Sequence, residues 1–92
     1  MANFAVKKDG PKVPFDSEKI KSGVMAACTE AGLSEEDATN VAEKVLSSVT
    51  MAFESQDEVA TSEIRDKILS ELDESQPAVA EAWRRYEESK SG

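Results

Sequence analysis

Apolar residues recur three and four positions apart through most of this chain, which is the spacing of one face of an α-helix. The first stripe starts after Asp16 or Ser17, either of which is a good N-cap, and stops at Gly32, a residue type that often ends helices. A longer stripe follows Ser34, whose hydroxyl can cap a helix that opens with three carboxylates. This second helix is predicted to be the longest of the protein and to fray near Ser55.

Two further helices are predicted in the second half of the chain. Thr61 or Ser62 is expected to cap the third helix. Pro77 suits the first turn of the fourth helix, because the N–H that proline lacks is unused there. The apolar stripes of these two helices are formed by Ile64, Ile68, Leu72, Val79, Trp83 and Tyr86. Both aromatic residues are interpreted as core side chains rather than as a stacking platform.

The opening residues predict a small β-hairpin instead. A short strand over 3–8 is followed by Asp9-Gly10, a dipeptide typical of type I′ turns, in which both central positions need positive φ. Pro11 and Pro14 restrict the segment 12–14 to an edge strand or an extended stretch. The segment 58–60 is short and extended, and it is a candidate third strand beside the hairpin.

These elements predict an α+β fold that is mainly α, with a four-helix core and a small N-terminal β-hairpin packed over it. The 92 residues are expected to form a single domain, with the hairpin over 3–14, the helical core over 17–90 and a loose tail at 91–92. A chain of this length buries only about 60% of the surface that its unfolded form exposes, so we expect a modest core.

The chain carries a net charge of −8 at pH 7. This charge disfavours DNA and RNA, whose phosphates require a basic face, and it disfavours anionic membrane surfaces. The sequence shows no membrane-spanning apolar run and no signal-peptide core. The single cysteine, Cys28, permits neither an internal disulfide nor a zinc site, and histidine is absent. We therefore expect a cytoplasmic protein that binds neither nucleic acid nor membranes.

Four of the eleven basic residues lie within the first twenty positions, at Lys7, Lys8, Lys12 and Lys19. Cations gathered on a hairpin and on the first turn of the following helix favour an anion, and phosphate is the first candidate. A plainer interpretation stands beside this one. Lys7 and Lys8 can protect a strand edge from aggregation, and Lys19 can be a solvated helix residue.

Three stretches of the sequence carry a family resemblance. They are Ala5-Val6-Lys7-Lys8-Asp9-Gly10, Pro14-Phe15-Asp16-Ser17-Glu18-Lys19-Ile20 and Val59-Ala60-Thr61-Ser62-Glu63-Ile64. In sequence and order they resemble the ATP-cone domain. That domain senses ATP against dATP in many ribonucleotide reductases, and it follows a zinc ribbon in the bacterial repressor of reductase genes. The resemblance extends over nearly the whole chain.

The resemblance implies that a nucleoside triphosphate is held between the hairpin and the helices. Lys7 and Lys8 stand where the hairpin cations of the family reach the phosphates, and the backbone at Val6 would lie near the adenine. Asp16 would help to hold the nucleoside, and Lys19 would contact the nucleotide from the first helix turn.

The resemblance also implies contacts from the second half of the chain. Thr61 matches the family's junction threonine, and Arg65 stands one turn later; on their own, the first would be a plain helix cap and the second an ion-pair partner of a nearby carboxylate. A late basic residue often completes the family's phosphate site, and Arg84 or Arg85 is the candidate here.

The chain departs from the family pattern at three positions. Ala5 replaces a valine, Lys8 replaces the usual arginine, and Val13 replaces an acidic residue. A lysine keeps the positive charge but loses the bidentate fork of arginine. Loss of the acidic residue at position 13 is expected to affect discrimination between riboses or bases more than it affects phosphate binding.

The expected function is a regulatory module that binds ATP or dATP without hydrolysis, with Mg²⁺ possible beside the nucleotide. Its state would pass to a partner protein or to a second copy of the chain. The sequence has no Walker-type glycine-rich motif and no recognisable catalytic constellation, so it does not read as an enzyme. No zinc ribbon or reductase domain accompanies the cone, which is expected to be free-standing, as the initial methionine favours, or excised from a larger protein. The alternatives are a degenerate cone that serves as a protein-interaction module without nucleotide, and a small phosphoryl-transfer enzyme.

Overall fold

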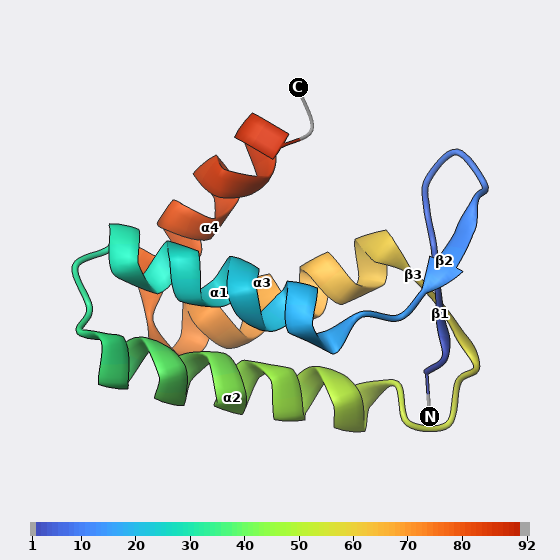
Figure 1. Ribbon diagram of the computed structural model, residues 1–92, viewed down its shortest axis with the longest axis horizontal. Coiled ribbons are helices and arrows are strands. Elements are labelled where there is room, and N and C mark those ends of the chain that lie inside the picture. Colours follow the sequence, from blue (N-terminus) through green and yellow to red (C-terminus); the bar gives the residue numbers. More distant parts are fainter. Residues whose placement is uncertain (1, 91–92) are drawn as a thin grey trace.

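The computed structural model describes residues 2–90 and shows an α+β fold that is mainly α, as predicted (Figure 1). The helices are α1 (Ser17–Glu30), α2 (Glu35–Ala52), α3 (Thr61–Ser75) and α4 (Pro77–Lys90). The strands are β1 (Phe4–Val6), β2 (Lys12–Pro14) and β3 (Glu58–Ala60). The proposed tail at 91–92 lies outside the described residues.

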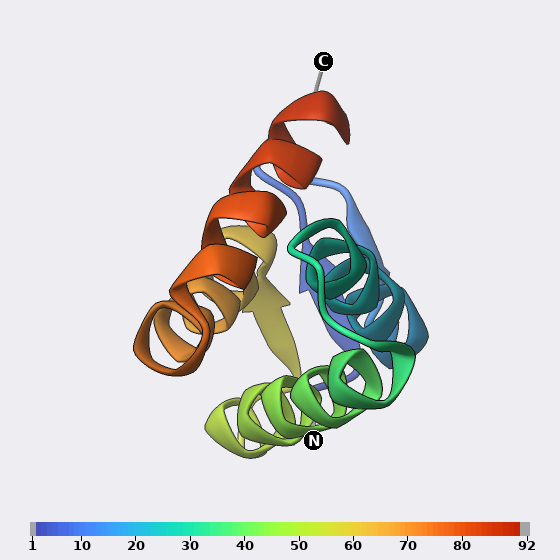
Figure 2. The same cartoon turned by 90° about the vertical axis from the view of Figure 1, so that its left-hand side faces the viewer.

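The four helices pack around one apolar core. α1 contacts α2 and α4, while α3 contacts α4 and α2, so the helices follow one another around a ring, which Figure 2 shows from one end. The core includes Val24 and Cys28 from α1, Val49 from α2, Leu72 from α3 and Val79 from α4, all of them fully buried. Among the described residues, no polar or charged side chain is buried with them. The predicted apolar stripes therefore do form the core.

The ends of α1 and the start of α2 agree with their sequence signals. The Lys19 N–H donates to the Asp16 carboxylate at 3.2 Å, and the Asp37 N–H donates to the Ser34 hydroxyl at 3.2 Å. Gly32 has a φ of +95°, which only glycine adopts at little cost, and the flanking backbone bonds form a Schellman motif.

The start of α3 differs from its prediction. Ala60 is the N-cap and Thr61 is the first helical residue, so neither Thr61 nor Ser62 caps the helix. Alanine offers no side-chain acceptor, and the only side-chain bond of this cap runs the other way, from the Ala60 N–H to the Glu63 carboxylate at 3.4 Å. The reason is that β3 continues to Ala60, so its sheet pairing fixes where the helix begins.

The three strands form one small sheet in the order β2-β1-β3. β1 pairs antiparallel with β2, placing Ala5 opposite Val13, and parallel with β3, placing Ala5 opposite Val59. The candidate third strand at 58–60 is thus confirmed. Because β2 leads into α1 and β3 runs directly into α3, the N-terminal ends of both helices meet at this sheet (Figure 1).

The hairpin forms as predicted, but its turn is of another kind. The Gly10 N–H donates to the Lys7 carbonyl and the Lys7 N–H donates to the Pro11 carbonyl, each at 2.9 Å. Gly10 has a φ of +107°, and no residue other than glycine has a positive φ in the described part of the chain, so the turn is not of type I′. The loop therefore spans three residues, Lys8 to Gly10, which leaves the strands shorter than the predicted 3–8.

No helix within residues 2–90 is both long enough and apolar enough to span a membrane.

Candidate functional site

A cleft of about 1070 Å³ lies between the hairpin, the first turns of α1 and α3, and the last two turns of α4. The hairpin and α4 rise on the same side of the helix bundle in both ribbon views (Figures 1 and 2). Two kinds of side chain line the cleft. The apolar lining includes Phe15, Ile64, Ile68, Trp83 and Tyr86, and the charged lining consists of Lys7, Lys8, Asp9, Asp16, Lys19, Arg65 and Glu87.

Two of the three lysines of the hairpin line the cleft, Lys7 directly after β1 and Lys8 in the turn. Side chains alternate between the two faces of a strand, so Ala5, Lys7 and Val13 reach the cleft while Lys12 lies on the other face. There the Lys12 ammonium sits 4.6 Å from the centre of the Phe4 ring and pairs with Glu58 at 3.2 Å. Of the four early lysines, three therefore belong to the cleft.

The first turns of α1 and α3 contribute the remaining cations. Asp16 caps α1 and Lys19 follows within its first turn, and both line the cleft. Thr61 and Arg65 stand one turn apart at the start of α3 and line it too. The backbone N–H groups of a first helical turn have no partner within the helix, so the helix end itself attracts anions.

Aromatic side chains of α4 form one wall of the cleft. Trp83 is only 5% exposed and belongs to the core, while Tyr86 is partly buried beside it. Both rings pack against Gly23 of α1, where a β-carbon would lie 3.5 Å from Tyr86 and 3.8 Å from the Trp83 indole nitrogen. The interpretation of these aromatics as core residues is correct for Trp83, which also contributes to the lining of the cleft.

The cleft is the positive part of an acidic protein. Four cations line it against the three carboxylates of Asp9, Asp16 and Glu87, which leaves the lining at +1 while the whole chain is at −8. One ion pair is formed inside it, between Arg65 Nε and Glu87 Oε1 at 3.4 Å. This arrangement suits an elongated anion that also carries an apolar or aromatic part.

The structure brings together six of the seven residues that the sequence suggested for nucleotide binding. They are Lys7, Lys8, Asp16, Lys19, Thr61 and Arg65. The seventh, Val6, is not among the residues that line the cleft, because neighbouring side chains of β1 point to opposite faces and Ala5 is on the cleft side.

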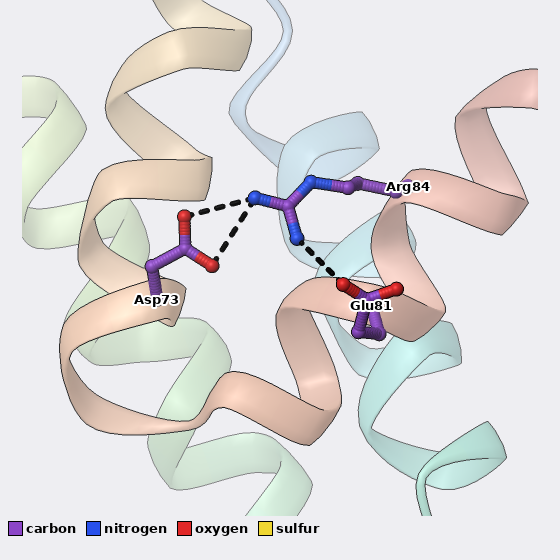
Figure 3. A network of polar contacts seen from close by, with 3 residues as sticks. All are labelled: Asp73, Glu81 and Arg84. Carbon is purple, nitrogen blue, oxygen red and sulfur yellow. Dashed lines mark hydrogen bonds and ion pairs between the residues drawn. The ribbon is translucent and has the colours of Figure 1, made fainter.

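The two late arginines lie elsewhere. Arg84 reaches Asp73 of α3 at 2.9 Å and Glu81 one turn back at 3.1 Å, as Figure 3 shows. Arg85 pairs with Glu30 of α1 at 3.5 Å. Neither arginine lines the cleft.

Sequence reasoning missed Glu87 as a residue of the cleft. A signal for it was present, because Trp83, Tyr86 and Glu87 follow the i, i+3, i+4 spacing of a single helix face. The sequence was searched for positively charged residues that could bind phosphate, so a carboxylate was not considered. The plainer interpretation of Arg65 was an ion pair with a carboxylate, and in the structure its partner is Glu87.

Comparisons with known proteins give two matches for this chain. A family model described as the ATP cone domain matches residues 4–91. The chain is also 36% identical over 69 residues to the transcriptional repressor NrdR of Bdellovibrio bacteriovorus. That alignment covers 75% of this chain and 34% of the repressor, so the chain spans about a third of the relative it matches. With a match over nearly its full length, the chain belongs to the ATP cone domain family.

Proposed function

We propose that this protein is a regulatory module that binds ATP or dATP in the cleft and does not hydrolyse it. The bound nucleotide would change how the module interacts with a partner protein. The observation that carries the proposal is that cations from three separate elements line one cleft. Lys7 and Lys8 come from the hairpin, Lys19 from α1 and Arg65 from α3. Family membership supports the choice of an adenine nucleotide.

The phosphates would bind among these cations. Hydrogen bonds between charged donors and phosphate oxygens are the stronger kind, and the first-turn N–H groups of α3 at Thr61 would add donors. Magnesium would enter with the triphosphate, whose oxygens are the hard ligands that this ion prefers. Asp16 would then face either that ion or the sugar.

The base would bind against the apolar part of the cleft. Phe15, Ile64 and the α4 aromatics offer an apolar surface, and a partly buried tyrosine ring is a suitable face for a purine. The backbone at Val6, which pairs with Lys12 across the hairpin, would approach the adenine base from β1. Ala5 and Val13, two of the departures from the family pattern, both line the cleft and would form part of the apolar surface beside the base.

The absence of histidine from the sequence supports binding without hydrolysis, since the commonest general base is missing. A regulatory effect then requires that the nucleotide bind two states of the protein, or of its complex, with different affinity. The hairpin, α1, α3 and α4 all contribute to the cleft, so occupancy can bias their relative positions. The surface that a partner or a second copy would sense includes these four elements.

Titration calorimetry with ATP, dATP, GTP and CTP tests the proposal, using a matched pair of variants. Lys8→Gln removes a cation of the cleft, whereas Lys12→Gln removes one from the opposite face of the same hairpin. We expect ATP or dATP to bind the unmodified protein, Lys8→Gln to weaken binding about tenfold, and Lys12→Gln to change it little. Amide shift changes should include Lys7, Lys19 and Thr61.

Two results would refute the proposal. Absence of heat and of shift changes with every nucleotide at millimolar concentration would favour a cone that serves only as a protein-interaction module. Release of ADP above background, in the presence of magnesium, would refute binding without hydrolysis.

A further inference from the structure

The Arg65–Glu87 ion pair is the feature of the cleft that phosphate binding does not explain. It joins the first turns of α3 to the last turn of α4, with Arg65 Nε 3.4 Å from Glu87 Oε1. The Glu87 side chain is only 24% exposed, against 49% for Arg65. A carboxylate thus lies within the cleft and already uses a donor of the one arginine there.

We propose that Glu87 is an internal competitor for phosphate, which weakens nucleotide binding by occupying Arg65. This inference rests on the proposed function and adds a specificity-determining residue to it. A carboxylate and a phosphate oxygen seek the same guanidinium donors in the same planar geometry. Arg65 therefore exchanges one anion for the other when a nucleotide binds.

The competition holds even if Arg65 offers its remaining nitrogens to the phosphate. Two anions would then share one cation, at a separation where like charges in a partly desolvated cleft repel each other. In both arrangements the Glu87 charge opposes the nucleotide charge. The repulsion between Glu87 and the nucleotide must rise with the number of phosphates. Glu87 therefore lowers the affinity for a triphosphate more than the affinity for a monophosphate.

A second ion pair of this protein supplies the matched control. Arg85 Nε lies 3.5 Å from Glu30 Oε1, and that pair also joins α4 to another helix, but neither residue lines the cleft. Glu87→Gln and Glu30→Gln therefore remove the same charge and break a similar interhelical contact. Only the first removes the competitor.

The test is calorimetric titration of ATP and AMP into the unmodified protein and the two variants, after circular dichroism has verified that each is folded. We expect Glu87→Gln to bind ATP about three to ten times more tightly, with a smaller gain for AMP, and Glu30→Gln to change neither.

Three outcomes would overturn the inference. If the unmodified protein binds ATP and Glu87→Gln leaves its affinity at the Glu30→Gln value, Glu87 is no competitor, while the proposed function stands. Weaker ATP binding by Glu87→Gln would place the carboxylate among the groups that hold the nucleotide or its magnesium ion. If neither the unmodified protein nor Glu87→Gln binds any nucleotide, the proposed function fails, and the inference fails with it.

Discussion

Replacing Gly23 by alanine is expected to stabilise this protein, although the residue lies in a tightly packed place. Gly23 is in the middle of α1 and is buried against the aromatic wall of α4. A glycine inside a helix costs stability because its unfolded chain has more conformations to lose. Whether alanine recovers that cost depends on the room for one methyl group.

The structure provides that room. The added β-carbon would lie 3.5 Å from the Tyr86 ring and 3.8 Å from the Trp83 indole nitrogen, which are ordinary van der Waals distances. The difference in helix propensity between glycine and alanine is about 0.8–1.0 kcal/mol, and no strain opposes it here. We therefore expect Gly23→Ala to raise the free energy of unfolding by about 0.5–1 kcal/mol, or roughly 2 to 8 °C in melting temperature for a domain of this size.

Thermal and urea unfolding followed by circular dichroism would measure the change, with Gly10→Ala as the control. At Gly10 no atom lies within 4 Å of the added carbon, yet φ is +107°, so alanine should destabilise by roughly 1–2 kcal/mol despite the open space. The two variants together distinguish the effect of backbone conformation on stability from the effect of packing. A clearly destabilised Gly23→Ala protein would refute the reasoning, because it would show that the two rings cannot accept the methyl group.

Other predictions follow from burial and from the polar contacts. Leu72→Ala should cost about 2–5 kcal/mol in urea unfolding because Leu72 is fully buried, whereas Met51→Ala, at a residue 70% exposed, should change stability little. Burial raises the pKa of the Cys28 thiol and shields it, so iodoacetamide should react only through opening of the fold, and saturating ATP should slow that reaction further. Reaction at the rate of a free thiol would contradict the buried position. Arg84→Gln should leave ATP affinity unchanged, since its guanidinium is held by Asp73 outside the cleft; a tenfold loss would return Arg84 to the phosphate site.

Local signals in the sequence predicted most of the fold. The caps at Asp16 and Ser34, the helix end at Gly32 and the apolar stripes each depend on residues at most a few positions apart, so they can be seen in one dimension. The same is true of the clustered lysines. Their grouping on the hairpin and the first turn of α1 was enough to suggest an anion site, and the family resemblance extended it to α3.

Pairing between distant segments decided what the sequence left open. β3 pairs with β1 more than fifty positions away, and this pairing makes Ala60, rather than a polar residue, the N-cap of α3. Strand alternation put Lys12 and Val6 outside the cleft, although both lie among residues that line it.

The sequence by itself therefore determined the helices, the hairpin and the identity of the cations that gather at the start of the chain. Only the tertiary structure decided which charges face one another. Arg65 meets Glu87 across 22 positions, and Arg84 and Arg85 are held by carboxylates outside the cleft. The physical reason is that a helix face follows from local spacing, whereas the partner of a long charged side chain depends on which other helix packs beside it.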